Sequence, residues 1–246
     1  MKFTSIFFTA SESILEIYLK YNTFAPINVI KMKKLVIFDL DGTLLDTIAD
    51  LAESANYALK QLGYPTHDAE TIRTFVGNGI NKLLERALPE NERTEENLMR
   101  MRTHFIPYYD AHNADLSTPY PGIVALLETL QAKGLMIAVA SNKYQEATVK
   151  LVKHYFPTIH FVEVLGQRDG IAVKPDPTIV FDILNKAEVC KEEVLYVGDS
   201  GVDMQTAINA GVDAIGVTWG FRPRAELESF CPKGIIEVAE RLNCYM

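Results

Sequence analysis

From Leu35 onward, short runs of apolar residues alternate with longer segments whose apolar positions recur every three or four residues. The short runs, rich in β-branched residues, predict strands, and the periodic segments predict helices. Strands that are apolar throughout must be covered on both faces, so this order predicts a doubly wound α/β fold with a parallel sheet. The expected strands are 35–40, 135–141, 160–166, 194–200 and 213–218, and the expected helices are 49–62, 123–133, 145–154, 177–187 and 202–210.

The interval 48–117 interrupts this alternation, because it shows helical periodicity and no convincing strand. We expect it to form a helical cap domain inserted into an α/β core made of 32–47 and 118–246. Residues 1–31 precede the first strong strand and show only a weak helical pattern. We therefore expect them to be an N-terminal extension that is not part of the folded core.

The composition narrows the classes of protein that fit. Hydrophobic residues make up 48% of the 246 residues and charged residues 23%, as in soluble globular proteins. The net charge of −8 argues against nucleic-acid binding, because affinity for a phosphate backbone needs clustered Lys and Arg. The 3 cysteines are odd in number and form no C-x-x-C pair, which favours a reducing cytoplasm. No apolar run approaches the ~20 residues that cross a bilayer, so no membrane insertion is expected.

The first predicted strand ends in two carboxylates, Asp39 and Asp41. Like charges this close repel each other, so a chain that keeps both favours acid–base chemistry or cation binding. Gly42 and Thr43 follow in a turn, which should direct both carboxylates to the edge of the sheet where α/β folds bind ligands. These residues alone are ambiguous, because an Asp-Gly turn also ends many ordinary strands.

Polar groups also follow the second strand and a later loop. Ser141 and Asn142 lie at a strand-to-helix turn, where hydroxyl, amide and backbone N–H groups suit phosphate oxygens. Lys174 lies in the proline-rich turn "VKPDP", which is suited to aiming an ammonium group at carboxylates and phosphate. Taken singly, each of these residues is more typical of a cap, a turn or a solvated surface.

Acidic groups return at the end of the fourth strand. Asp199 ends that strand in "VLYVGDS", and Asp203 follows at the start of a helix, where an Asp is also a common N-cap. Facing Asp39, these carboxylates would form the oxygen-rich pocket that Mg²⁺ prefers. The coincidence of polar groups at successive strand ends indicates one site.

In chain order, "DLDGT", Ser141, Lys174 and "GDSGVD" resemble the motifs of the haloacid dehalogenase-like (HAD) hydrolase superfamily. The resemblance extends from Leu35 to about Leu242 and implies a Rossmann-like HAD core with an α-helical cap. It implies an enzyme in which Asp39 attacks phosphorus and forms an aspartyl-phosphate.

The remaining roles are likewise implied by the resemblance. Asp41 would act as general acid and base, and its backbone carbonyl would bind Mg²⁺ together with Asp39 and Asp199. Asp203 would orient the ligands of the ion, or would bind the ion directly. The resemblance implies four residues in phosphate binding: Ser141, Asn142, Lys174 and Thr43. The hydroxyl of Thr43 would also position the Asp41 segment.

The superfamily contains several reactions, and some residues discriminate among them. Dehalogenases lack the second acid, whereas Asp41 is present. A phosphonatase needs a Lys near the cap entry, and the segment there offers only Lys60, far along its predicted helix. Mutases such as β-phosphoglucomutase usually carry a His in the helix after the first motif, and none is found here. Hydrolysis of a small phosphomonoester is favoured; a mutase, a pyrophosphatase, a nucleotidase or a non-catalytic phosphate-binding protein are the alternatives.

The segments "DGTLLDTIADLAESANYAL", "FVGNGINKLLERAL", "PYPGI" and "VTWGFRP" resemble the phosphoglycolate phosphatase branch. That resemblance implies 2-phosphoglycolate as substrate. The cysteine pattern favours a cytoplasmic location, and monomer and homodimer both stay open. The cap loop would close over the substrate, and an Arg would bind the substrate carboxylate. The same residues are also consistent with a flexible turn before a helix and with an Arg on a solvated helix face. The cap candidates are Arg73, Gly77, Asn78 and Gly79, and further candidates for anion contact are Arg222 and Arg224.

Overall fold

A parallel six-stranded sheet lies at the centre of the described part of the protein, in the order β5-β4-β1-β6-β7-β8. The computed structural model describes residues 32–246, so the predicted extension 1–31 lies outside the described residues. The strands are β1 (Leu35–Phe38), β4 (Met136–Tyr144), β5 (Phe161–Gln167), β6 (Val194–Gly198), β7 (Asp213–Val217) and β8 (Gly234–Ile236). The doubly wound α/β fold predicted from the sequence is confirmed.

Strand β1 shows why helices cover both faces of the sheet. Val36 and Phe38 belong to an apolar cluster with residues of α6 (Ile123–Ala132) and α7 (Gln145–Tyr155). Leu35 and Ile37 belong to a second cluster with residues of α8 (Thr178–Ala187) and α9 (Gly201–Ala210). Successive side chains of a strand point to opposite faces, so a strand that is apolar throughout needs a helical layer on each side.

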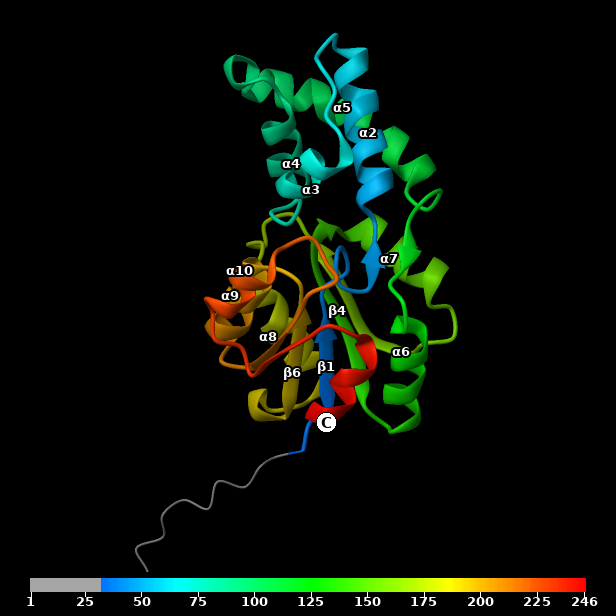
Figure 1. Cartoon of the computed structure of the whole chain (residues 1–246), viewed down its shortest axis with the longest axis vertical. Coiled ribbons are helices and arrows are strands. Elements are labelled where there is room, and N and C mark those ends of the chain that lie inside the picture. The colour runs from blue at the N-terminus through cyan, green and yellow to red at the C-terminus, as the bar shows by residue number, and fades with distance from the viewer. Residues whose placement is uncertain (1–31) are drawn as a thin grey trace, which may run out of the picture. The chain divides into compact units, whose positions relative to one another are not determined.

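The remaining elements lie around this core and above one edge of it (Figure 1). The shorter elements of the core are η2 (Lys191–Glu193), α10 (Arg224–Glu228) and η3 (Ala239–Tyr245). The segment above the sheet contains α2 (Ile48–Gln61), α3 (Ala69–Phe75), α4 (Ile80–Ala87), η1 (Glu90–Glu92) and α5 (Glu95–His112). None of the helices between 32 and 246 is both long and apolar enough to span a bilayer.

Helices α2 to α5, called the cap below, pack around a second centre of apolar residues, to which the core adds Ala147 of α7. Leu59, Leu84, Met101 and Phe105 are almost completely buried within it. A separate cluster indicates that these helices cohere as a unit, because burial of apolar area is the main force that holds helices together in water. The boundaries of the predicted domains, 48–117 against 32–47 and 118–246, stay a prediction.

The two connections between the sheet and the cap run side by side. Strands β2 (Leu45–Asp46) and β3 (Thr118–Pro119) pair antiparallel where the chain enters and leaves the cap. In the first turn of α2, the buried Asp50 accepts hydrogen bonds from the backbone N–H groups of Leu116 and Ser117, at 3.0 and 2.8 Å. The sequence pattern does not predict these strands, because two residues are too short to show a period of two.

Candidate active site

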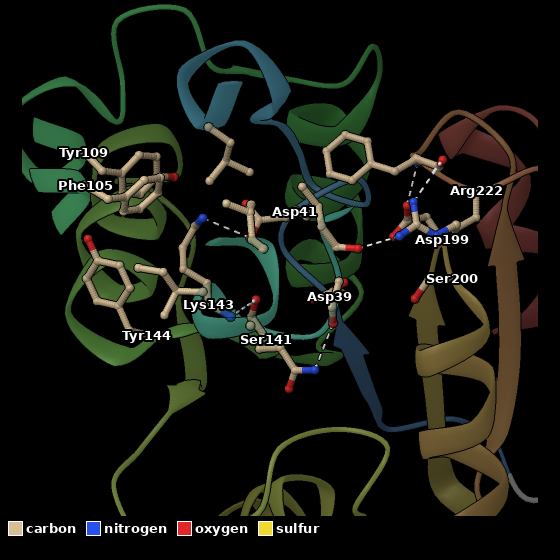
Figure 2. Close-up of a pocket in the computed structure, with 18 residues that line it drawn as sticks. Asp39, Asp41, Phe105, Tyr109, Ser141, Lys143, Tyr144, Asp199, Ser200 and Arg222 are labelled. Atoms are coloured by element: carbon tan, nitrogen blue, oxygen red, sulfur yellow. Dashed lines mark hydrogen bonds and ion pairs between the residues drawn. The ribbon is translucent and has the colours of Figure 1, made fainter. Parts of the chain in front are cut away.

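The end of β1 places Asp39 between the ends of its two neighbours. Phe38 is in register with Val139 of β4 on one side and Val197 of β6 on the other. The polar residues that follow β1 and β6, and Ser141 within β4, therefore meet at one edge of the sheet. Figure 2 shows Asp39 between Ser141 and Lys143 on one side and Asp199 on the other.

A tight turn after β1 gives Asp199 its place in this site. Gly42 has a φ of +85°, in the left-handed region that favours glycine. A Cβ atom at this position would collide with the carboxylate of Asp199. The glycine thus allows the backbone after Asp41 to approach the acidic group at the end of β6.

Lys174 is the cation at the centre of the site. Its ammonium group lies 2.9 Å from Asp39 and 2.7 Å from Asp203, and it also donates to the carbonyl of Ala140 and the hydroxyl of Tyr196. Burial alone would lower the pKa of Lys174, but the attraction of Asp203 and Asp39 raises this pKa well above its usual value. Lys174 therefore stays charged although it is only 2% exposed.

The carboxylates of Asp39, Asp199 and Asp203 form a buried acidic cluster, with one oxygen of each within 4.8 Å of the others. Burial and the repulsion of Asp203, only partly offset by Lys174, raise the pKa of Asp39 to about 7. Burial and the charges of Asp203 and Asp39 raise the pKa of Asp199 well above its usual value. The cluster therefore holds more negative charge than Lys174 neutralises.

This acidic cluster fits a hard divalent cation such as Mg²⁺, which takes oxygen ligands. Asp203 is turned away from such an ion, because its oxygens accept from Lys174 and from the hydroxyl of Ser200 at 2.7 and 2.6 Å. Asp199 accepts from the backbone N–H of Phe221 at 2.7 Å. Asp39 and Asp199 thus retain oxygens for a metal ion.

Asp41 is held by two residues that were not identified from the sequence. Thr47 donates its hydroxyl to Oδ1 of Asp41 at 2.7 Å, and the ammonium group of Lys143 lies 3.0 Å from Oδ2. Thr47 directly precedes α2, and Lys143 directly follows the Ser141-Asn142 pair in β4. Both residues stand close to motif residues in the sequence, and this proximity is the signal that could have identified them.

Thr43 and Asn142 make contacts other than those expected. The hydroxyl of Thr43 donates to Asp199 at 3.3 Å and not to Asp41, because the turn at Gly42 brings this residue to the end of β6. The amide of Asn142 donates to the carbonyls of Lys174 and Gly77, and its oxygen accepts from the N–H of Lys174 at 2.9 Å. Its side chain therefore holds the Lys174 loop and is not free for phosphate.

Of the cap candidates, Gly77 and Gly79 line the pocket above the acidic cluster, and both have positive φ. Asn78 and Arg73 do not line it. Asn78 accepts a hydrogen bond from Arg86 at 2.9 Å, while Arg73 pairs with Glu70 at 3.2 Å. The glycines of the cap loop thus face the site with backbone atoms, and the guanidinium group of Arg73 lies over the ring of Phe221, which lines the pocket.

Arg222 joins the core to the cap through backbone atoms. From the loop after β7, its guanidinium group donates to the carbonyls of Arg73, Thr74 and Val76. The preceding residue, Phe221, donates to Asp199. The same short loop therefore contacts the cap and the acidic cluster. Arg224, the other Arg considered, pairs with Glu228 and Glu237 at the surface.

The chain is similar to known hydrolases in sequence and in structure. The sequence profile of haloacid dehalogenase-like hydrolases matches residues 36–217. The phosphoglycolate phosphatase of Vibrio parahaemolyticus is 36% identical over 193 residues, which cover 76% of this chain and 85% of that protein. The phosphoglycolate phosphatase of Mannheimia succiniciproducens is 33% identical over 210 residues, covering 83% and 94%. Among solved structures, a predicted phosphoglycolate phosphatase from Haemophilus somnus gives a TM-score of 0.81 at 29% identity, covering 87% and 98%.

Proposed function

Because the chain belongs to the haloacid dehalogenase-like hydrolase family, we propose that it is a phosphatase that hydrolyses 2-phosphoglycolate to glycolate and phosphate. The observation that carries this proposal is the arrangement of Asp39, with Lys174 at 2.9 Å and the Asp199 carboxylate beside it. The relatives named above support this choice of substrate, because both are phosphoglycolate phosphatases and the matches cover most of the chain. The substrate is thus a small phosphorylated metabolite.

Asp39 is the nucleophile in this proposal. Its carboxylate oxygen attacks phosphorus, the bond to the ester oxygen breaks, and an aspartyl-phosphate forms. Water then attacks the same phosphorus, and the bond to Asp39 breaks to release phosphate. Lys174 holds the attacking carboxylate in place and, with the hydroxyl of Ser141, stabilises the charge on the transferring phosphoryl group. Asn142 contributes by positioning Lys174.

Asp41 is the general acid and base. It gives a proton to the ester oxygen as this oxygen leaves, and it takes a proton from the attacking water in the second step. Thr47 and Lys143 each engage one of its oxygens, which restricts the rotation of the carboxylate. A fixed orientation matters because the proton must move between groups at hydrogen-bond distance.

Mg²⁺ would be held by Asp39, Asp199 and the backbone carbonyl of Asp41, with Asp203 orienting the site through Lys174 and Ser200. When bound, the ion supplies the positive charge that lets a dianionic phosphate approach a carboxylate. The cytoplasmic location is part of the proposal, supported by cysteines that are free thiols, all exposed. The proposal does not specify an oligomeric state.

Binding of Mg²⁺ should stabilise the protein more as pH rises. Without metal, the raised pKa of Asp39, about 7 against an ordinary 3.8, favours its protonated form. The stability linked to this proton is present at low pH and is lost as pH rises through about 7. Mg²⁺ needs the ionised form, so it should raise Tm by about 3 °C at about pH 8 and by less than half as much at about pH 5.5.

Thermal unfolding of the full chain with and without Mg²⁺ measures both shifts. Asp199→Asn, which removes one charge from the proposed metal site, is expected to lose most of the shift at the higher pH. Equal shifts at the two pH values, or an undiminished shift in the variant, would contradict this assignment.

The proposed function is tested by phosphate release from 2-phosphoglycolate, sugar phosphates, nucleotides and pyrophosphate. We expect 2-phosphoglycolate to give the highest kcat/KM, EDTA to stop the reaction, and excess Mg²⁺ to restore it. Preference for a nucleotide or pyrophosphate would point to those alternatives, and exchange between sugar-phosphate isomers without release would point to a mutase. Absence of release from every compound would overturn the proposal.

A further inference from the structure

The pocket above Asp41 has mainly apolar walls on its cap side. Leu51, Val76, Ile80, Leu83 and Phe105 line it there. An apolar wall gives a charged substrate nothing to bind, so the recognition of its charged end must come from the few polar groups in this part of the pocket. The polar side chains on this side are those of Lys143, Tyr109 and Tyr144, and the hydroxyl of Tyr144 already donates to Asp110. Figure 2 shows the ammonium group of Lys143 between Asp41 and Tyr109.

The hydroxyl of Tyr109 is a buried donor without a partner. Tyr109 belongs to α5 and is completely buried, and its ring stacks on Phe105 at 5.3 Å. Among residues 32–246, no group forms a hydrogen bond with its hydroxyl. Burial and the nearby charge of Asp41 raise the pKa of Tyr109, so the hydroxyl keeps its proton. Buried hydroxyl groups are normally paired, so an unpaired one that lines a pocket indicates a ligand.

Lys143 offers a positive charge at the same place. Its side chain is 4% exposed, and its ammonium group lies 3.0 Å from Asp41 and 4.8 Å from the centre of the Tyr109 ring. An ammonium group has three donors, and Asp41 is the acceptor that it meets within the described residues. Donors therefore remain for a second anion next to Asp41.

The other cations near the pocket are engaged elsewhere. Lys174 binds Asp39 and Asp203. Arg222, which lines the pocket, gives its donors to backbone carbonyls of the cap. Arg86 donates to the carbonyl of Phe75 and to Asn78. Arg73 pairs with Glu70 and lies over the ring of Phe221, and it does not line the pocket, although its Nε has no partner among residues 32–246. Of the two cations that line the pocket, Lys143 is thus the one with donors left for a substrate group beyond the phosphate.

We propose that Lys143 and the hydroxyl of Tyr109 form a subsite that binds the carboxylate of the substrate. The inference rests on the proposed function, in which Asp41 protonates the ester oxygen. In a phosphorylated 2-hydroxy acid, a single carbon separates that oxygen from the carboxylate, so the carboxylate must lie beside Asp41, where Lys143 lies. One carboxylate oxygen accepts from Lys143 and the other from Tyr109. The substrate class is therefore a short phosphoester with its carboxylate one carbon from the ester oxygen.

The test compares two substrates that differ only at this group. 2-Phosphoglycolate carries the carboxylate, and 2-hydroxyethyl phosphate carries a CH₂OH group in its place. Tyr109→Phe removes only the unpaired hydroxyl and keeps the stacked ring, so the fold should be retained. We expect the ratio of the two kcat/KM values to fall about tenfold in this variant, chiefly through KM for 2-phosphoglycolate.

Two further variants make the test specific. Tyr108→Phe is the matched control, because Tyr108 is the neighbour of Tyr109 in α5, stacks on Tyr57 and does not line the pocket. Its ratio should equal that of the wild-type protein. Lys143→Met should lower the ratio by more than Tyr109→Phe does, and it should also slow both substrates because Lys143 contacts Asp41.

Each outcome decides the question. If Tyr109→Phe and Lys143→Met leave the ratio of kcat/KM unchanged, the carboxylate subsite is overturned while the phosphatase activity stands. The same conclusion follows if the wild-type protein hydrolyses 2-hydroxyethyl phosphate and 2-phosphoglycolate with equal kcat/KM. If the wild-type protein with Mg²⁺ releases phosphate from neither ester, the proposed function itself fails.

Discussion

Asp39→Asn is expected to lower kcat on 2-phosphoglycolate by about four orders of magnitude or more, because an amide cannot form the aspartyl-phosphate. The fold should be retained, since Asn has nearly the same shape as Asp. The change also removes a buried carboxylate that Asp203 repels. Phosphate release and thermal unfolding of the variant measure the two effects, and we expect Tm without metal to be equal to or higher than that of the wild-type protein.

The control for this substitution is Asp169→Asn, which makes the same chemical change at an exposed position. Its turnover should match that of the wild-type protein. Residual activity of a few per cent or more in Asp39→Asn would show that another group attacks phosphorus. A large fall in Tm would show instead that Asp39 is needed for the fold.

Lys174→Met is expected to damage both activity and stability. The change leaves Asp39 and the fully buried Asp203 without their positive partner. Removal of one member of a buried charge pair costs about 3–5 kcal/mol of folding free energy. We expect kcat to fall by about three orders of magnitude, because the nucleophile loses its orientation and the phosphoryl group loses a cation. Denaturant unfolding and phosphate release measure these losses.

A double variant separates the two effects of Lys174→Met. Adding Asp203→Asn removes the stranded charge, so it should restore part of the lost stability but none of the activity. Lys153→Met, at an exposed position in α7, controls for the loss of a lysine and should change neither. If the double variant is less stable than Lys174→Met, charge burial is not the cause of the instability.

Much of the sheet was predictable because its strands are buried on both faces. Leu35 to Phe38 are at most 1% exposed, and such a strand has to be apolar at every position. Strand β8 was missed, since its three residues Gly234–Ile236 are too few to form a recognisable run. The helical nature of the cap was predictable for a similar reason, because its apolar cluster imposes a helical period.

The acidic part of the site was predictable because the order of parallel strands brings their ends together. With β1 between β4 and β6, the polar residues Asp39, Ser141 and Asp199 must lie close to each other. The partners of Asp41 were not predictable in this way. Whether a hydroxyl reaches Asp41 from Thr43 or from Thr47 depends on the path of a turn, and no hydrophobic period encodes that path.

The same limit applies to the cap. The sequence suggested that the side chain of Arg73 would face the substrate, but its guanidinium group lies over the ring of Phe221 and its carbonyl oxygen accepts from Arg222. A carbonyl belongs to every residue type, so no letter in the sequence identifies its role. The Tyr109–Lys143 pair escaped notice for another reason, because a Tyr in a helix and a Lys after a strand are ordinary residues until the fold brings them together.

The contacts of Arg222 with the carbonyls of Arg73, Thr74 and Val76 have a consequence for the evolution of this protein. Mutations that change the side chains at these three positions leave the accepting oxygens in place. The hydrogen bonds from Arg222 can therefore persist along a lineage while the side chains at these three positions change. Arg222 itself has no such freedom, which predicts that variation among descendants will concentrate on the cap side of this contact.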